Sequence, residues 1–294
     1  MASLGFIGLG LMGAPMARNL LKGGHTVSGF DINAAAARAA AAQGVRACGS
    51  PKAVAQRSQA VFIVVPDTPD VEQVLFGAEG VAEGAAPGTV VVDMSSISPV
   101  ESRRFAERLA GRGVEMLDAP VSGGQVGAEA GTLSIMVGGE EATLARVRPY
   151  LELLGQTLTH IGGHGAGQTA KVANQIIVAL NLEAICEAFL FVTRAGVDPD
   201  KVRRALLGGA ANSRLLELKG EWILNRTFKP GFRIKDQQKD LNNALNAARE
   251  LGVALPNTAA TQELYNVIRA EGGADLDHSA IILALERLAG PGRP

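Results

Sequence analysis

The sequence predicts an α/β fold in which a mostly parallel β-sheet domain is followed by an all-α C-terminal domain. In the first half, short runs rich in β-branched and aromatic residues alternate with alanine-rich stretches of helix length. Beyond Ile161 no further run has the pattern of a strand. A chain of 294 residues is long enough for two domains of ordinary size, so we expect a first domain over residues 1–162 and a second over residues 163–294.

The expected strands follow one another through the first domain. They are Leu4–Ile7, Thr26–Phe30, Ala60–Val65, Thr89–Val92, Val114–Leu117 and Leu133–Val137. Helix-length segments separate several of them, among them Met12–Lys22, Ala34–Gln43 and Pro99–Gly111. Strands separated by helices form βαβ units with parallel strands, and ligands of such sheets bind beside the carboxyl ends of the strands.

The second domain begins after a glycine-rich segment that predicts a flexible hinge. The glycines of this segment are Gly162, Gly163, Gly165 and Gly167. A long helix is expected from about Gln168 to about Ala195. Asp198 and Pro199 then predict the N-cap and the first residue of the next helix, and further helices are expected to the end of the chain.

The composition argues against several classes of protein. The net charge of −1 offers no basic surface for nucleic acid, and 47% hydrophobic with 19% charged residues is typical of a globular chain. The longest apolar tract, Ile176–Val192, is interrupted by Asn181, Glu183 and Glu187, which argues against a membrane span. The first residues, Met1–Gly13, lack the positively charged start of a signal peptide.

The cysteines and histidines give no metal-binding pattern. Cys48 and Cys186 lie far apart and form no Cys-x-x-Cys pair, so we expect two buried thiols and a cytoplasmic protein. The four histidines form no ligand cluster, so we expect no metal and place these side chains in loops or on the surface. They are His25, His160, His164 and His278.

A G-x-G-x-x-G pattern lies between the first expected strand and the first expected helix. It comprises Gly8, Gly10 and Gly13, with Leu11 and Met12 between the last two. The first glycine permits a tight turn, the second lets the backbone approach a pyrophosphate, and the third lets the helix pack closely on the strand. Exposed N–H groups at the helix start favour the phosphates. The pattern therefore predicts a Rossmann-type dinucleotide-binding domain, with a plain strand-to-helix turn as the alternative.

Asp31 follows the second expected strand, where the dinucleotide fingerprint has an acidic residue. Its carboxylate can accept hydrogen bonds from the adenosine ribose hydroxyls and would repel a 2′-phosphate. The next residues, Ile32 and Asn33, supply no arginine for such a phosphate. We therefore expect NAD rather than NADP. A helix-capping or turn aspartate is the alternative interpretation.

The long helix after the glycine-rich segment carries two polar stripes. The stripe formed by Lys171, Asn174, Gln175, Val178 and Asn181 has the spacing of one helix face. The second stripe consists of Glu183, Glu187 and Arg194. Solvent explains one polar stripe, so the other is expected to face a cleft. A lysine in a cleft suits carbonyl reduction, because its ammonium stabilises the negative charge that hydride transfer leaves on the carbonyl oxygen and can donate a proton to that oxygen. A surface lysine in the first helical turn is the alternative.

The chain resembles the β-hydroxyacid dehydrogenases along nearly its whole length. Five segments carry the resemblance and follow one another in the family's order. They are Gly5–Gly13, Asp93–Ile97, Asp118–Gly124, Gly165–Asn174 and Lys239–Leu241. The resemblance implies an NAD-dependent enzyme that transfers a hydride to or from a small carboxylate substrate, assembled as a homo-dimer or homo-tetramer, without a nucleic-acid or membrane partner.

The resemblance also implies a role for individual positions. Lys171 matches the catalytic lysine, and Asn174 matches its polar partner. Gln175 stands where many members carry a second asparagine, and we expect it to contact the substrate. The loop matched to the substrate carboxylate consists of Ser122, Gly123 and Gly124. Positions matched to cofactor contacts are Val65, Pro66, Ser96, Phe232, Lys239 and Asp240.

The implied substrate is a small 3-hydroxy acid or the corresponding aldehyde acid. Asp93–Ser96, Gly231–Lys235 and Asp277–Ser279 are more similar to the branch that reduces tartronate semialdehyde to glycerate. 3-Hydroxyisobutyrate and succinic semialdehyde are the alternative substrates. A non-catalytic dinucleotide-binding scaffold is the alternative of another class, and the presence of Lys171 and of the carboxylate loop argues against it. Imine reductases of similar fold usually replace this lysine.

Overall fold

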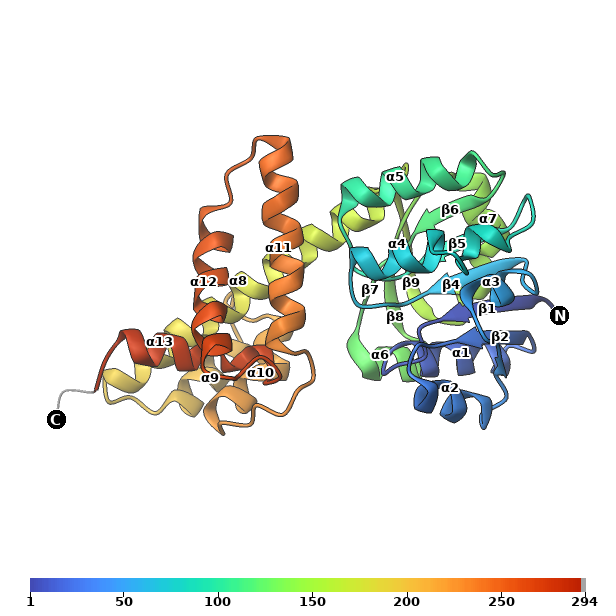
Figure 1. The fold of residues 1–294 in the computed structure, drawn as a ribbon. Helices are drawn as coiled ribbons and strands as arrows, with labels where there is room; N and C mark the ends of the chain where they lie inside the picture. The colour runs from blue at the N-terminus through green and yellow to red at the C-terminus, as the bar shows by residue number, and fades with distance from the viewer. Residues whose placement is uncertain (292–294) are drawn as a thin grey trace. The chain divides into compact units, whose positions relative to one another are not determined.

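The computed structural model of the chain describes residues 1–291 and divides into two compact units (Figure 1). The first unit, Met1–Lys171, contains the β-sheet, and the second begins at Val172 and is helical. The expected fold class, a mostly parallel sheet domain followed by an all-α region, is therefore confirmed.

The sheet of the first unit is parallel over most of its width. Its strand order is β3-β2-β1-β4-β5-β6-β8-β7, and β9 pairs with β8. The pairs from β3 through to β6 are parallel, whereas β8 runs antiparallel to β6 and β7 and parallel to β9. The strands are β1 Ser3–Ile7, β2 Thr26–Phe30, β3 Arg46–Ala47, β4 Ala60–Ile63, β5 Val90–Asp93, β6 Glu115–Asp118, β7 Val121–Ser122, β8 Leu133–Gly138 and β9 Gly155–Gly162.

The six expected strands are present, with ends shifted by a few residues. Three further strands, β3, β7 and β9, were not expected. The first two have only two residues each. The third has mostly exposed side chains, including Gln156, Thr157 and His160, so it lacks the apolar pattern of a buried strand. Beyond Gly162 the described residues form helices and loops, with one isolated bridge between Arg233 and Asp277.

Helices cover both faces of the sheet because alternate strand residues point to opposite sides. Phe62 packs in a core with side chains of α1, α2, α6 and α7, and its neighbours Val61 and Ile63 pack in a second core with α3, α4 and α5. The helices of this unit are α1 Gly13–Lys22, α2 Ala34–Ala41, α3 Pro51–Ala55, α4 Thr68–Phe76, α5 Pro99–Ala110, α6 Gly124–Ala130 and α7 Glu141–Leu151, with a short 3₁₀ helix at Val81–Glu83. The result is a three-layer α/β/α unit (Figure 1).

The second unit is built around the long helix α8, Ala166–Arg194, whose first residues belong to the first unit. Leu182, Cys186 and Phe189 of α8 pack in one core with Tyr265. The expected N-cap is confirmed, since the Asp198 side chain accepts hydrogen bonds from two backbone N–H groups at the start of the next helix. The remaining helices are α9 Pro199–Leu207, α10 Arg214–Leu224, α11 Ile234–Leu251, α12 Pro256–Ala270, a 3₁₀ helix His278–Ile281 and α13 Ile282–Leu288.

Helix α8 is long and apolar enough to cross a membrane by length and composition only, and 28% of its most apolar window is buried inside the protein. Its polar residues Glu183 and Glu187 hydrogen-bond to each other. Burial and the neighbouring Glu187 carboxylate raise the pKa of Glu183 to about 7. Part of α8 nevertheless lies in the core of the second unit, whereas most of its apolar window is not buried in the single chain.

Two expectations about single side chains are wrong. Cys48 is half-buried rather than buried, because it lies at the sheet edge after the two-residue strand β3. His278 is neither a loop nor a surface residue: it exposes 3% of its surface and lies in a 3₁₀ helix. Cys186 is buried as expected.

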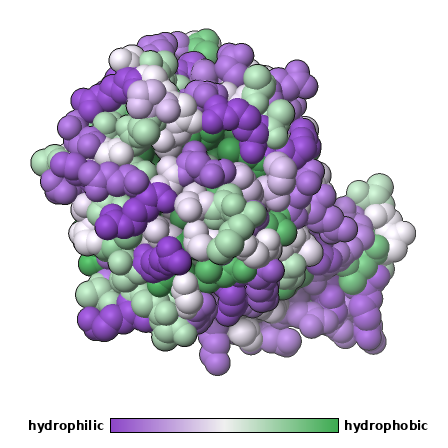
Figure 2. Space-filling view, turned by 90° about the vertical axis from the view of Figure 1, so that its right-hand side faces the viewer, coloured by the Kyte–Doolittle hydropathy of each residue, from purple (hydrophilic) through white to green (hydrophobic). Residues whose placement is uncertain are grey.

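The face seen in Figure 2 is mostly hydrophilic, with hydrophobic side chains scattered in small groups.

Candidate active site

The glycine loop after β1 is shaped by close backbone contacts. Gly8 has φ +89°, and a Cβ added at Gly13 would lie 1.8 Å from the Gly8 carbonyl oxygen. A Cβ added at Gly10 would meet nothing within 4 Å, so the space beside this residue is open. Helix α1 then starts without a side-chain cap and without an acidic residue in its first turn. Open space beside a helix start that no side chain caps fits a dinucleotide pyrophosphate.

Asp31 lies at the carboxyl end of β2 and is tied to this loop. Its Oδ2 accepts a hydrogen bond from Leu9 N at 2.6 Å, and its Oδ1 accepts one from Asn33 N at 2.7 Å. The side chain is half-exposed, so the remaining lone pairs of the carboxylate stay accessible to ribose hydroxyls. Asn33 caps α2 through its own side chain, so the capping role considered for Asp31 belongs to its neighbour.

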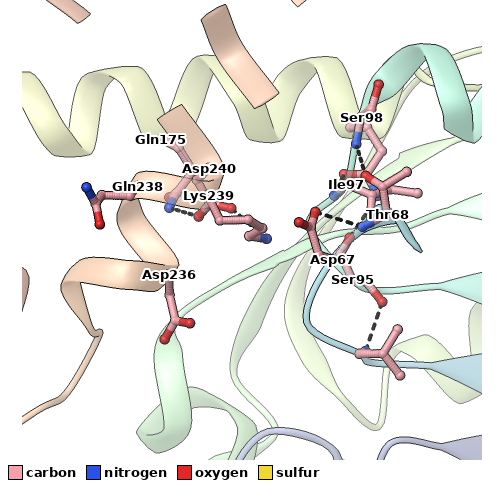
Figure 3. A network of polar contacts seen from close by, with 12 residues as sticks. Asp67, Thr68, Ser95, Ile97, Ser98, Gln175, Asp236, Gln238, Lys239 and Asp240 are labelled. Carbon is pink, nitrogen blue, oxygen red and sulfur yellow. Dashed lines mark hydrogen bonds and ion pairs between the residues drawn. The ribbon is translucent and has the colours of Figure 1, made fainter. Parts of the chain in front are cut away.

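The loops that follow β4 and β5 are joined by hydrogen bonds. Val65 N donates to Ser95 Oγ at 3.0 Å, and Ser98 N donates to Thr68 Oγ1 at 3.1 Å (Figure 3). Ser96 lies half-buried between these contacts, and Pro66 is exposed. The structure therefore brings together the segments expected to flank the cofactor after β4 and β5.

The carboxylate loop lies just after β6. Gly123 and Gly124 have φ values of +134° and +61°, which residues with a Cβ rarely adopt. Both glycines are exposed, and Ser122 beside them is half-buried at the end of β7. These exposed glycines place no side chain between the backbone of the loop and an approaching carboxylate.

Lys171 is buried, exposing 9% of its surface. It lies in the second turn of α8 and is the last residue of the first unit, which also contains the glycine loop and the carboxylate loop. The surface-lysine alternative is therefore excluded, because a surface lysine keeps its ammonium in water.

Three candidate residues of the second unit meet one another. Gln175 Nε2 donates a hydrogen bond to Asp240 Oδ2, and Lys239 Nζ forms an ion pair with Asp240 Oδ1 at 2.8 Å (Figure 3). Asp240 exposes 4% of its surface, so the ammonium and the amide compensate its buried charge. Asn174, on α8 beside Gln175, is half-buried.

Phe232 is held by a side chain that sequence reasoning assigned no role. Asp277 Oδ2 accepts hydrogen bonds from Gly231 N at 2.9 Å and Phe232 N at 3.0 Å, and it pairs with Lys219 Nζ at 2.7 Å. The Phe232 ring packs edge-on against His278, with ring centroids 5.4 Å apart. Asp277 and His278 stood in a segment matched to the family, whereas nothing in the sequence distinguishes Lys219 from a surface lysine.

Burial and charged or hydrogen-bonding neighbours together determine the protonation states in this cluster. Desolvation lowers the pKa of His278 to about 4, so its imidazole is neutral at neutral pH. Burial opposes ionisation of Asp277 as well, but the Lys219 ammonium and the backbone donors hold the pKa of this carboxyl below its usual value. The loop around Phe232 is thus fixed by a buried ion pair. Within residues 1–291, no group of three or more histidine, cysteine or acidic side chains has the geometry of a metal site.

The glycine loop, the acid after β2 and the strand-end loops define a dinucleotide-binding oxidoreductase domain. Residues 3–162 match the family described as the NAD binding domain of 6-phosphogluconate dehydrogenase. Residues 165–285 match the family described as NAD-binding of NADP-dependent 3-hydroxyisobutyrate dehydrogenase. The two matched ranges meet between the end of β9 and the start of α8.

Individual relatives are similar over the full length. The chain is 54% identical to the 2-hydroxy-3-oxopropionate reductase of Escherichia coli (strain K12), over 97% of this chain and 98% of the relative. It is 40% identical to the 2-(hydroxymethyl)glutarate dehydrogenase of Eubacterium barkeri, over 98% and 96%. The solved structure of Mycobacterium tuberculosis 3-hydroxyisobutyrate dehydrogenase with L-serine superposes with a TM-score of 0.89 at 37% identity, over 97% of this chain and 99% of that chain. The chain therefore belongs to the β-hydroxyacid dehydrogenase family and is an oxidoreductase that binds NAD(P).

Proposed function

We propose that the protein reduces tartronate semialdehyde to glycerate with NADH as the hydride donor. The observation that carries this proposal is the burial of Lys171 on a turn of α8 that belongs to the same compact unit as the glycine loop and the carboxylate loop. The identity of 54% to a relative named 2-hydroxy-3-oxopropionate reductase supports this substrate over others.

The residues of the first unit have separate tasks in the proposed reaction. The N–H groups of Gly123 and Gly124 and the Ser122 hydroxyl bind the substrate carboxylate and so orient the aldehyde. NADH, when bound, supplies the hydride to the aldehyde carbon. The Lys171 ammonium stabilises the negative charge that develops on the aldehyde oxygen and transfers its proton to that atom. The products are glycerate, NAD⁺ and a neutral amine that regains a proton from solvent.

We propose NAD rather than NADP because of Asp31. Both of its carboxylate oxygens accept backbone hydrogen bonds, so the side chain is fixed at the end of β2, where the adenosine ribose of a dinucleotide binds. A fixed carboxylate at that position repels a 2′-phosphate. Asp31→Ser should therefore lower the KM for NADPH relative to that for NADH. A wild-type KM that is lower for NADPH than for NADH would contradict the proposal.

The remaining assignments are proposals that rest on the resemblance. Asn174 and Gln175 are polar partners of the lysine and the substrate, and Lys239 and Asp240 act at the nicotinamide end of the cofactor. The contacts of Gln175 and Lys239 with Asp240 support treating these three as one polar group.

The test is an NADH-oxidation assay with tartronate, methylmalonate and succinate semialdehydes. We expect the highest kcat/KM for tartronate semialdehyde. Lys171→Met should lower turnover by about 10³-fold, a loss typical of removing a positioned proton donor together with its charge, with the Kd for NADH unchanged. Lys22→Met, at an exposed lysine that ends α1, is the matched control and should keep full activity. Near-normal turnover in Lys171→Met would reject the role of the amine.

Oxidation of 3-hydroxyisobutyrate is the second candidate function. It is favoured by the match of residues 165–285 to the 3-hydroxyisobutyrate dehydrogenase family and by the superposition on the mycobacterial enzyme. The same assay distinguishes the two, because methylmalonate semialdehyde would then be the preferred substrate. A non-catalytic scaffold would consume NADH with none of the three aldehydes.

We also propose that the protein is a cytoplasmic homo-oligomer. Large apolar side chains on α8 are exposed in the single chain, with Ile177 at 65% and Phe191 at 74%. Burying such side chains against a second copy would remove apolar surface from water. Light scattering after gel filtration should give a mass of at least twice 30.4 kDa.

A further inference from the structure

The first turn of α8 is anchored by a carboxylate from the sheet. Asp118, the last residue of β6, accepts a hydrogen bond from Gly165 N on Oδ1 and another from Gln168 N on Oδ2, both at 2.8 Å. The first N–H groups of a helix have no partner within the helix, so Asp118 satisfies two of them and opposes the positive end of the helix dipole. Burial raises the pKa of Asp118, while these N–H donors counteract the effect.

A second side chain ties the same turn to the loop after β5. Gln168 exposes none of its surface. Its Oε1 accepts a hydrogen bond from Ile97 N at 3.1 Å, and its Nε2 donates one to Ser95 O at 2.8 Å. These two backbone groups flank Ser96, so a single planar amide spans a peptide segment that is expected to contact the cofactor. Two bonds from one amide fix both the distance and the rotation of the helix turn relative to the loop.

The turn cannot move closer to the sheet or tilt freely against it. A Cβ added at Gly167 would lie 2.4 Å from Met136 O and 2.5 Å from Asp118 O, so the helix backbone is in direct contact with β6 and β8. Lys171 follows Gln168 by three residues and therefore projects from a neighbouring position on the same side of the helix. Any shift of the first turn is transmitted to the amine.

We propose that Asp118 and Gln168 are positioning residues that set the height and rotation of Lys171 relative to the loops of Ser96 and Ser122. The inference rests on the proposed proton-transfer role of Lys171. Asp118 connects two parts of the site, because its side chain holds the lysine helix while its backbone leads within four residues to Ser122. Neither residue touches the reacting atoms in this scheme, so both act through the lysine.

Gln168→Met tests the proposal with little change in side-chain volume. The variant loses both hydrogen bonds to the Ser96 segment and keeps the packing of the helix. We expect kcat to fall by about 10- to 100-fold, since a displacement of about 1 Å can cost that much in a positioned reaction. The Kd for NADH should change much less than kcat, because the glycine loop that binds the pyrophosphate is unchanged. The apparent pKa of the pH–rate profile should also move, since the surroundings of the amine change.

Two controls separate positioning from general loss of stability. Val147→Ala removes buried volume from α7 in the same unit and should lower Tm while leaving kcat and the pH–rate profile unchanged. Asp118→Asn retains one oxygen acceptor and replaces the other with a donor that faces an N–H group. It should therefore reproduce the Gln168→Met phenotype by a second route. This variant also supplies the test where Gln168→Met fails to fold.

A double-mutant cycle distinguishes failure of this inference from failure of the proposed function. If Lys171→Met retains turnover, the proposed function is wrong and the positioning role fails with it. If Lys171→Met is impaired but Gln168→Met and Asp118→Asn keep wild-type kcat and pH profile, only the positioning role is overturned. The expected result is that Gln168→Met slows the wild-type enzyme but adds nothing to Lys171→Met, because the two residues act as one unit.

Discussion

Gly13→Ala and Gly10→Ala each add one methyl group but should have different effects. The first should lower the stability of the protein, and the second should weaken NADH binding. At Gly13 the new Cβ would lie 1.8 Å from the Gly8 carbonyl oxygen, so backbone must move. Overpacking of this kind costs about 1–3 kcal/mol, which lowers Tm by roughly 2–12 °C at about 2–4 °C per kcal/mol for a unit of this size. At Gly10 the Cβ would meet nothing within 4 Å, so the free protein should keep its Tm within about 1 °C.

NADH binding, unlike stability, should depend strongly on the absence of a side chain at Gly10. Its methyl group would occupy the open space in which the pyrophosphate approaches the backbone, so Gly10→Ala should raise the Kd for NADH at least about tenfold. Differential scanning fluorimetry of the ligand-free protein and fluorescence titration with NADH measure the two quantities. Gly24→Ala is unsuitable as a control because of its φ of +82°, whereas Gly49→Ala has open space and an ordinary φ and should change neither quantity. Wild-type NADH affinity in Gly10→Ala, or an unchanged Tm in Gly13→Ala, would refute the reasoning.

Three further predictions concern titratable groups. Burial depresses the pKa of His278 from about 6.5 to about 4, so the free energy of unfolding falls by roughly 3 kcal/mol as pH falls from 6.5 to 4. Urea unfolding should show a smaller loss over this pH range in His278→Gln. An equal dependence of the unfolding free energy on pH in the two proteins would contradict this. Burial and Glu187 raise the pKa of Glu183 to about 7. The stabilising contribution of Glu183 is therefore present below pH 4.5 and is lost as pH rises through 7. The free energy of unfolding of Glu183→Gln should exceed that of the wild type at pH 8 but not at pH 4.5. Burial raises the pKa of the Cys186 thiol, so a thiol reagent should modify only Cys48 in the native protein and both cysteines in denaturant.

Those parts of the fold could be predicted from the sequence for which a single sequence pattern is sufficient. Buried strands such as Val90–Asp93 form continuous apolar runs, and a G-x-G-x-x-G pattern between a strand and a helix is typical of dinucleotide-binding domains. β9 escaped prediction because an edge strand with exposed side chains has no apolar run to reveal it. The two-residue strands β3 and β7 are too short for any periodicity.

Side-chain networks were much less predictable than strands. Asp118 and Gln168 are separated by 50 residues, and only the folded sheet brings the carboxylate to the start of the helix. The same reason explains the wrong expectation for His278: polar residues are mostly exposed, and its burial depends on contacts with Gln237 and Phe232, about 41 and 46 residues away in the chain. The contact between Gln175 and Asp240 joins two motifs that matched the family, but nothing in their spacing predicts it.

The division of the chain inside α8 limits how the protein can be taken apart or recombined. Domains are usually joined at exposed linkers, where a cut or a fusion leaves both sides intact. Here the helix continues without interruption from Lys171 into Val172, so no such point exists beside the lysine. A gene fragment ending at residue 162 would encode the dinucleotide-binding sheet without the amine. An exchange of helical units between relatives would therefore either transfer the lysine together with the helical unit, or require two helix segments to be joined in register within α8.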